Sequence, residues 1–385
     1  MIPYGRQDIR DEDIGAVVEV LRSDWLTQGP TVPRFEAAIA AHCGAAQAVA
    51  VCSATAALHI ACLALDLGPG DVLWTVPNTF VASANCALYC GARVDFVDID
   101  PRTYNMSVEA LREKLVRAER AGCLPKVVIP VHFAGQSCDM RAIRALAEHY
   151  GFRIIEDASH AVGGSYLNAA VGNCQYSDIA VFSFHPVKII TTAEGGMALT
   201  NDAELAERLR VLRTHGITRD VARMREPSQD PWYYEQVDLG FNYRMTDVQA
   251  ALGVSQSSRL REYITRRRSI ARIYDEALQP LPLILPFQHP DAESAFHLYV
   301  IQIDPSRAAL DRRSVFNVLR AAGIGVNVHY IPVHTQPHYR TLGFAPGQYP
   351  VAERYYANAL SLPMFATLSD SQQNFVISSL RKALG

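Results

Sequence analysis

Residues 182–200 read FSFHPVKIITTAEGGMALT, an apolar run that contains one lysine and leads through a Glu-Gly-Gly turn into a second apolar run. No charged residue between Asp178 and Glu194 balances Lys188, and the chain has only four lysines against 32 arginines. An arginine would serve a salt bridge equally well. A desolvated lysine amine differs because it can lose its proton and attack a carbonyl to form a Schiff base. The ordinary alternative is a lysine that extends from a strand end into water.

The same stretch belongs to a series of short β-branched runs that alternate with helical segments. The runs lie at residues 48–51, 71–76, 93–99, 126–133, 153–157, 179–184 and 195–200. Two intervening helices are expected at 55–68, closed by a Gly cap, and at 107–122, opened by a Ser cap and closed by Gly. This α/β alternation predicts a mainly parallel sheet with helices on both faces.

Beyond residue 201 the pattern changes to long helices, at 205–216 and 245–278, and then to a Pro-rich segment at 278–290. Runs at 297–304, 312–323 and 325–333 predict a smaller α+β domain. We therefore expect a large domain over 1–250 and a small one over 251–385. Four arginines in the helix expected at 245–278 predict that one face of this helix is exposed to solvent. They are Arg266, Arg267, Arg268 and Arg272.

Composition excludes several classes of protein. The 385 residues are 49% hydrophobic with a formal net charge of −3, which argues against a nucleic-acid partner. The chain shows no secretory leader and no membrane-length apolar run, so we expect a cytoplasmic protein without a membrane partner. The eight cysteines lack metal-ligand spacing and predict reduced thiols. Cys86 and Cys90 fall on one helix face, but no further ligand accompanies them, so no metal is expected.

The strand that precedes the lysine ends in RIIEDASHA, which places Asp157 at the carboxyl edge of the predicted sheet. A pyridoxal phosphate ring needs a carboxylate beside its nitrogen, because the protonated ring withdraws electrons from a substrate carbanion. Asp157 fits that role, and His160 is placed to reach the ring's phenolic oxygen. The alternative is a helix-capping Asp followed by a surface His.

The cofactor's phosphate requires backbone N–H groups, which the start of a helix leaves unsatisfied. In VAVCSATAALH a strand runs into a helix through small residues, so Thr55 and Ala56 can offer their amides and Thr55 its hydroxyl. Ser183 can add another hydroxyl. Phe80, in PNTFVASAN, can stack on the ring, although an aromatic at a strand end is more often core.

Taken in order, these motifs together with SFHPVKIITTAEGG and GFNYRMTDVQAALG resemble the DegT/StrS-type sugar aminotransferases. That family has the fold-type I, aspartate aminotransferase-like architecture, with a seven-stranded sheet and a smaller C-terminal domain, and uses pyridoxal phosphate. By resemblance, Lys188 forms the Schiff base, Asp157 pairs with the ring nitrogen and Phe80 stacks on the ring. The other cofactor positions are Ser53, Thr55, Ala56, His160, Ser183 and, across a homodimer interface, Asn242. The alternative for Asn242 is an ordinary helix cap.

Within the family, IPYGRQDI, LTQGP, HGITRD and GVNVHYIPVH resemble the transaminases of pseudaminic acid biosynthesis. These enzymes transfer an amino group from L-glutamate to carbon 4 of a UDP-linked 4-keto-6-deoxy-N-acetylhexosamine. The resemblance assigns sugar-binding positions to Tyr4, Asp24, Trp25, Leu26, Thr27, Ala54, His329, Tyr330, Ile331 and Pro332.

Two positions depart from the pattern of the relatives. Cys52 stands where Asn is common, and Ala170 stands near a usual basic residue, so the contacts to the substrate's acetyl or charged groups can differ. Other functions stay open. They are amination of a different nucleotide sugar at carbon 3 or 4, a vitamin B6-dependent sugar dehydratase, which carries His in place of the lysine, and a regulatory relative without turnover.

Overall fold

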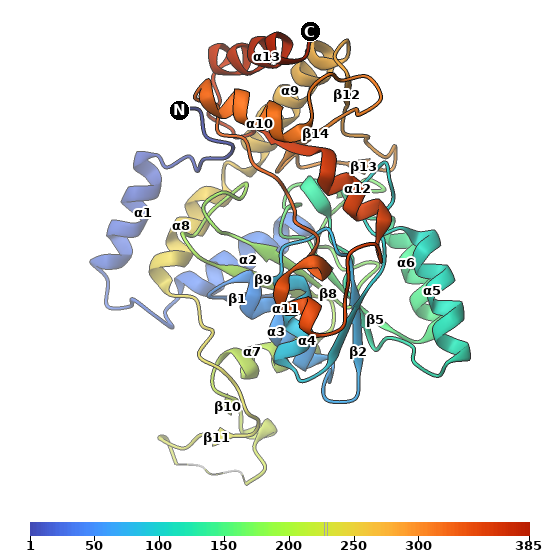
Figure 1. The fold of residues 1–385 in the computed structure, drawn as a ribbon. Coiled ribbons are helices and arrows are strands. Elements are labelled where there is room, and N and C mark those ends of the chain that lie inside the picture. Colours follow the sequence, from blue (N-terminus) through green and yellow to red (C-terminus); the bar gives the residue numbers. More distant parts are fainter. Residues whose placement is uncertain (227, 229) are drawn as a thin grey trace.

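A computed structural model describes residues 1–226, 228 and 230–385. A seven-stranded sheet forms its centre, in the order β1-β9-β8-β5-β4-β2-β3 (Figure 1). The strands are β1 (Gln47–Val51), β2 (Val72–Thr75), β3 (Arg93–Phe96), β4 (Val127–Val128), β5 (Arg153–Asp157), β8 (Ile179–Ser183) and β9 (Gly196–Thr200). Each predicted apolar run supplies one of them. The sheet is mainly parallel, because only β9 runs antiparallel to its neighbours.

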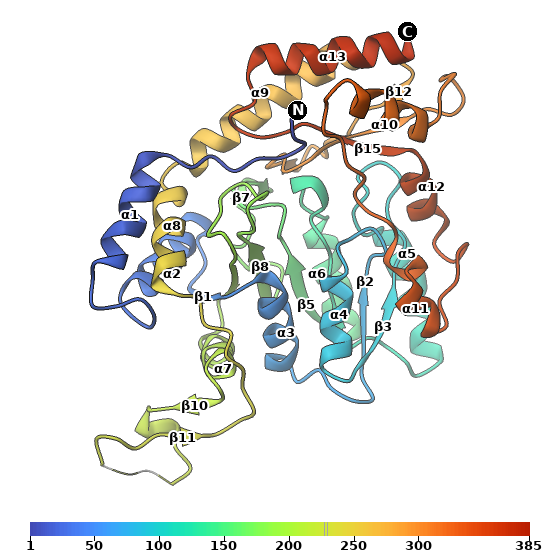
Figure 2. The ribbon, with the colours of Figure 1, turned by 60° about the vertical axis from the view of Figure 1, so that its left-hand side comes forward.

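Helices cover both faces of this sheet, as the alternating pattern predicts (Figure 2). On one face lie α3 (Ala54–Ala64), α4 (Ala82–Tyr89) and α7 (Ala203–Arg213). On the other lie α5 (Val108–Arg120) and α6 (Met140–Tyr150), since the connections through them run back along the sheet and right-handed crossovers then require the opposite face. The Ser107 hydroxyl caps α5 by accepting from the Ala110 N–H at 3.1 Å, as expected.

Three local predictions were wrong. Helix α3 ends with Leu65 as its C-cap rather than at Gly68. Strand β4 pairs over only two residues of the predicted eight, and Pro130, which has no N–H to donate, lies within the remainder. The helix predicted over 245–278 is interrupted near Ser258 and forms α8 (Asp247–Ser257) and α9 (Leu260–Leu278).

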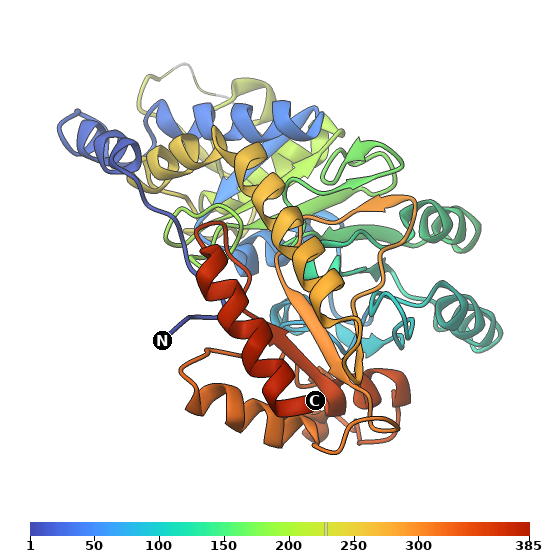
Figure 3. The same ribbon diagram turned by 90° about the horizontal axis from the view of Figure 1, so that it is seen from above.

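The C-terminal part has its own three-stranded sheet, β12 (Leu283–Ile284), β14 (Tyr299–Ile303) and β15 (Ala359–Leu362). Helix α9 packs there beside α13 (Asp370–Leu384), as Figure 3 shows from above. The N-terminal segment joins this part through an Ile2–Ile324 bridge. The domain boundary near residue 250 stays a proposal. The remaining elements are α1 (Asp11–Leu21), α2 (Thr31–Cys43), β6 (Ser165–Tyr166), β7 (Ala169–Ala170), β10 (Ile217–Thr218), β11 (Glu235–Gln236), β13 (Ala292–Glu293), α10 (Arg312–Ala321), α11 (Pro337–Thr341) and α12 (Pro350–Asn358).

The predicted solvated arginine face was wrong at Arg267, which is only 2% exposed. Its guanidinium donates to the carbonyls of Phe296, His297 and Met364 at 3.0–3.2 Å. Burial lowers its pKa to about 10. The other three arginines of the cluster pair with acidic side chains near the surface. Arg267 therefore ties α9 to the two chain segments that border the site described below.

An arm that includes β10 and β11 projects away from the body of the molecule (Figures 1 and 2). It presents large apolar side chains to solvent. Trp232 is 74% exposed and Leu239 is 75% exposed.

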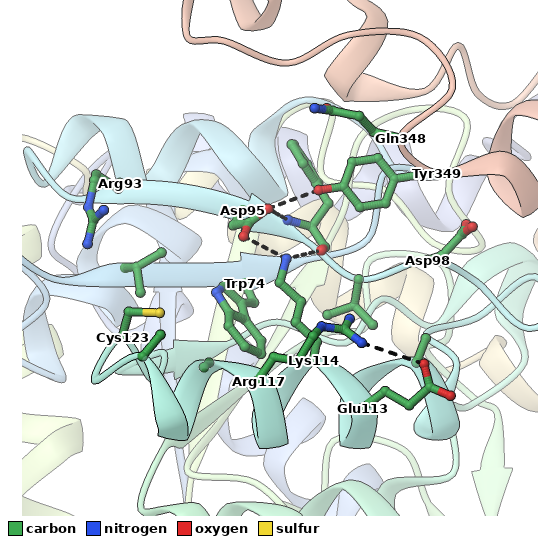
Figure 4. A pocket seen from close by; sticks show the side chains of 16 residues that line it. Trp74, Arg93, Asp95, Asp98, Glu113, Lys114, Arg117, Cys123, Gln348 and Tyr349 are labelled. Carbon is green, nitrogen blue, oxygen red and sulfur yellow. Dashed lines mark hydrogen bonds and ion pairs between the residues drawn. The ribbon is translucent and has the colours of Figure 1, made fainter.

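The sheet ends at β3, beside a cavity of about 460 Å³ between this strand, α5 and the segment around Tyr349 (Figure 4). Lys114 reaches across the cavity, where its ammonium pairs with Asp95 at 2.6 Å, donates to the Phe96 carbonyl and lies 4.7 Å from the Trp74 ring centre. The Tyr349 hydroxyl donates to the same carboxylate at 2.9 Å.

All eight cysteines are free thiols, and only Cys123 is exposed. Over the ranges that the structure describes, no group of three or more His, Cys, Asp or Glu side chains is arranged to hold a metal ion. No helix in those ranges combines the length and the apolar character that crossing a membrane would require.

Candidate active site

The candidate site lies where two neighbouring parallel strands end. Asp157 is the last residue of β5 and Ser183 the last of β8, and these strands pair in parallel register. Lys188 follows in the connection between β8 and β9, where its N–H donates to the His185 carbonyl at 2.8 Å. The predicted meeting of these residues at the carboxyl edge of the sheet is therefore what the structure shows.

Lys188 has an altered acid–base balance. Burial lowers its pKa to about 8, and the nearby charge of Asp157 offsets only part of that effect. A lysine that simply reached into water would keep a pKa near 10.4. The amine is therefore available for nucleophilic attack at neutral pH to a much larger extent than an ordinary lysine.

Asp157 is a buried carboxylate, 5% exposed, held by two donors. The Ser83 hydroxyl donates to its Oδ2 at 2.6 Å, and the Ser159 N–H donates to its Oδ1 at 3.1 Å. Each oxygen keeps further acceptor capacity. The carboxylate is thus fixed in orientation and can still accept from a cationic ring N–H.

His160 is buried rather than on the surface, at 5% exposed. Its Nδ1 accepts from the Ala134 N–H at 3.3 Å, and its Nε2 lies 3.1 Å from the Tyr330 hydroxyl. Burial, with the charges of Lys188 and His329, lowers its pKa well below the usual value. The imidazole is neutral, and both of its nitrogens already have protein partners.

Helix α3 begins beside the start of β9, at the position predicted to hold the phosphate. Contrary to the prediction for Ala56, its N–H is already engaged, since it donates to the Ser53 hydroxyl at 3.1 Å. The amides of Ala54 and Thr55 are the ones left for a ligand. Gly196 permits this arrangement, because a Cβ there would lie 2.5 Å from the Ala54 nitrogen. This close approach explains the second glycine of the Glu-Gly-Gly turn.

Phe80 is not a core residue, since 59% of its side chain is exposed. It lies at the start of α4, 6.4 Å from the Tyr330 ring between ring centres. An exposed phenyl ring beside Tyr330 offers a flat apolar surface to an aromatic ligand.

The other predicted positions fall into two groups. Tyr4, His329 and Tyr330 come together, with the rings of Tyr4 and His329 5.4 Å apart. Further out, Asp24, Trp25, Leu26 and Thr27 form an exposed loop between α1 and α2, joined to α8 by a Thr27–Thr246 bridge. Pro332 is buried and Ile331 is exposed.

Asn242 is exposed and pairs through its backbone with Thr214, at the base of the projecting arm. It is not a helix cap, because Thr246 holds that position at the start of α8 and accepts from the Gln249 N–H at 3.1 Å. That alternative interpretation was wrong. The cross-subunit role stays a prediction.

Two site residues were missed by the sequence interpretation. Ser83 lies within the quoted PNTFVASAN, three residues after Phe80, so helical spacing signals its position. His297 packs against His160 with ring centres 4.4 Å apart and is 4% exposed. Its Nδ1 meets no partner among the residues that the structure describes. Nothing in the local sequence separates it from a core histidine.

Together these groups fit pyridoxal phosphate. The amine of Lys188 can bind an aldehyde, the Asp157 carboxylate can hold a protonated ring nitrogen, and Phe80 can cover a ring face. The start of α3 offers amides to a phosphate group.

Comparison with known proteins agrees with this chemistry. Spore coat polysaccharide biosynthesis protein SpsC of Bacillus subtilis is 42% identical over 383 residues, covering 99% of this chain and 96% of that protein. The structure of a putative sugar aminotransferase, Spr1654 of Streptococcus pneumoniae in its PMP form, matches with a TM-score of 0.90 at 30% identity, covering 100% and 99%. Helicobacter pylori PseC, an aminotransferase of pseudaminic acid biosynthesis, matches with a TM-score of 0.89 at 31% identity and the same coverage. The family model of the DegT/DnrJ/EryC1/StrS aminotransferases matches residues 7–381, and the chain belongs to that family.

Proposed function

We propose that this sugar aminotransferase moves the amino group of L-glutamate to carbon 4 of a UDP-linked 4-keto-6-deoxy-N-acetylhexosamine. The product would be UDP-4-amino-4,6-dideoxy-N-acetyl-β-L-altrosamine. The family and its solved PLP-form and PMP-form relatives establish pyridoxal phosphate as the cofactor. The observation that carries the transamination chemistry is the desolvated Lys188 amine beside the fixed Asp157 carboxylate.

When bound, pyridoxal phosphate supplies an aldehyde that carries the amino group and a ring that withdraws electrons. The protein must hold the ring nitrogen protonated, and Asp157 has the charge and the free acceptor sites to do so. It must also move a proton at the reacting carbon. Lys188 suits this task, because a pKa of about 8 lets the amine both take up and release a proton near neutral pH.

The substrate rests on likeness to relatives. PseC is described as an aminotransferase of pseudaminic acid biosynthesis, and SpsC as a polysaccharide biosynthesis protein. The first description supports an amino-sugar product, and the second supports a place in polysaccharide biosynthesis. Amination of another nucleotide sugar at carbon 3 or 4 is the second candidate, and the 42% identity to SpsC favours keeping it. Dehydration is disfavoured, because the lysine is present.

We further propose a homodimer in which Asn242 of each chain completes the partner's cofactor site. The projecting arm supports this, since Trp232 and Leu239 expose apolar surface that a second copy would cover. The exposed Asn242 at the base of the arm is free to face a neighbouring chain. A cytoplasmic location belongs to the same proposal, because nucleotide sugars are made there.

The test is to incubate the purified protein with pyridoxal phosphate, L-glutamate and a panel of UDP- and dTDP-linked 4-keto and 3-keto sugars. Mass measurement and NMR then identify the aminated product and its configuration. We expect the UDP-linked N-acetylated 4-keto sugar to be the best substrate, and Lys188→Ala to give no turnover. A product aminated at carbon 3, or a preference for dTDP sugars, would replace the proposed substrate with another of the same class.

A further inference from the structure

The hydrogen bonds around His160 fix which of its nitrogens carries the proton. The Ala134 N–H can only donate, so the Nδ1 that it meets at 3.3 Å must be unprotonated. In a neutral imidazole the proton then lies on Nε2. That nitrogen is 3.1 Å from the Tyr330 oxygen and therefore donates to it.

The backbone around Ala134 is built to maintain this bond. Ala134 has a φ of 58°, in the left-handed region that costs a non-glycine residue about 1 kcal/mol. The carbonyls of this turn accept from Leu298 at 3.2 Å and from Ala295 at 2.9 Å, which keeps the turn docked against the segment before β14. These hydrogen bonds hold the strained turn in place, and the turn directs the Ala134 N–H toward His160.

Tyr330 is fixed as well. Its backbone N–H donates to the Asn78 side chain at 3.2 Å, and its ring stacks on His160 at 20° and meets Phe133 edge-on. Burial, followed by the charges of Asp157 and Tyr4, raises the pKa of its hydroxyl. The phenol therefore keeps its proton at neutral pH. Because its oxygen already accepts from His160, that proton must be donated elsewhere, and no protein acceptor meets it in the described part of the chain.

We propose that Tyr330 donates a hydrogen bond to the oxo oxygen of the sugar substrate, and that His160 is the positioning residue that turns the Tyr330 proton toward it. This inference rests on the proposed function and specifies the contact at the reacting carbonyl. It also revises the expected role of His160, whose two nitrogens are engaged by the protein.

The oxo oxygen of a keto sugar matches the free proton of the Tyr330 hydroxyl. A sugar ketone is neutral and can only accept hydrogen bonds. The charge of Lys188 helps to lower the pKa of His160, so the His160–Tyr330 pair belongs to the same site as the amine.

The decisive experiment measures the two half-reactions separately in single-turnover mixing, using Tyr330→Phe. Glutamate converts the loaded protein without any sugar, whereas the keto sugar is needed only for the return step. We expect the return step to slow by about 100-fold, the range seen when one such donor is removed, while the glutamate step stays within about twofold. Tyr274→Phe is the matched control, because it removes a buried hydroxyl whose acceptor, the Pro363 carbonyl, lies outside the site.

Variants at position 160 test the positioning role. His160→Gln can accept from Ala134 through its oxygen and donate to Tyr330 through its nitrogen, so it should restore most of the return-step rate. His160→Leu should slow that step as much as Tyr330→Phe does, and the double variant should be no slower than either single one. An additive loss in the double variant would contradict an action of His160 through Tyr330.

Two results would overturn the assignment to the sugar. One is an equal slowing of both half-reactions, and the other is a shift in the pH titration of the visible absorption of the sugar-free, loaded Tyr330→Phe protein. Either would mean that the hydroxyl contacts the cofactor instead. Failure of the proposed function would give a different result. The wild-type protein would then complete the half-reaction with glutamate, but no keto sugar would support the second half-reaction.

Discussion

Replacing Lys188 with Met should make the protein without cofactor more stable at neutral pH. Methionine has similar length and no charge, so the change removes a partly buried ammonium and keeps the packing. A pKa of about 8 instead of 10.5 corresponds to at most about 3 kcal/mol of unfavourable burial. Part of the side chain is accessible to water, so we expect a gain of about 1 to 2 kcal/mol in the free energy of unfolding.

The gain should depend on pH in a defined direction. Below about pH 8 the ammonium is charged in both the folded and the unfolded chain, and the full cost of burying it is present. Between pH 8 and 10.5 only the unfolded chain keeps the proton, so the wild-type protein becomes more stable relative to Lys188→Met as the pH rises. At pH 9.5 the difference should be less than about half of its value at pH 7.

Reversible urea unfolding of both unloaded proteins at pH 7 and pH 9.5 measures these free energies. Lys126→Met is the matched control, because Lys126 is partly exposed and pairs with Asp71 at 2.9 Å. That substitution should cost up to about 1 kcal/mol, with no comparable change between the two pH values. A Lys188→Met protein that is less stable than the wild type at pH 7, or a gain that does not shrink at pH 9.5, would refute the claim that this amine is desolvated.

Three further predictions address the carboxylate, the shared site and the buried arginine. Asp157→Asn should fold normally and lose several orders of magnitude in turnover, because the ring nitrogen loses its anionic partner; activity within about tenfold of the wild type would exclude the role. Co-expressed Lys188→Ala and Asn242→Ala chains, each inactive alone, should regain activity in mixed dimers, and mixed dimers seen by native mass spectrometry without activity would refute the shared site. Arg267→Met should lower the free energy of unfolding by about 2 kcal/mol, because three buried carbonyls lose their donor, whereas Arg266→Met should cost less than about 1 kcal/mol in the same urea titration.

The sheet could be predicted because parallel strands that are buried on both faces have contiguous apolar residues in the sequence. This pattern differs clearly from the periodic pattern of an amphipathic helix. The burial of Arg267 follows from the helical spacing of the apolar residues around it. Leu260, Tyr263, Ile264, Ile270 and Tyr274 mark the buried face of α9, and helical spacing places Arg267 on the same face. Charge alone therefore predicted the wrong environment, and periodicity would have corrected it.

The proposed catalytic pair could be predicted for a different reason. Asp157 ends β5 and Lys188 lies in the connection that follows the neighbouring strand β8, so the order of the strands brings both to the same edge of the sheet. The contact between His160 and Tyr330 joins residues 170 positions apart and depends on how the small C-terminal sheet packs. The Ser83 hydroxyl on Asp157 likewise depends on the side-chain direction of α4. Local sequence carries no information on such distances, which only tertiary packing determines.

The Lys114 bridge at β3 has a consequence for how the protein behaves among copies of itself. An edge strand offers unpaired N–H and C=O groups to any passing strand, which is a common route to aggregation. Here the outward N–H of Phe96 donates to Asp95 at 2.7 Å, and its outward carbonyl is taken by Lys114. With both outward groups of Phe96 occupied, the end of β3 offers a further strand less to pair with, which disfavours growth of the central sheet beyond seven strands at this edge.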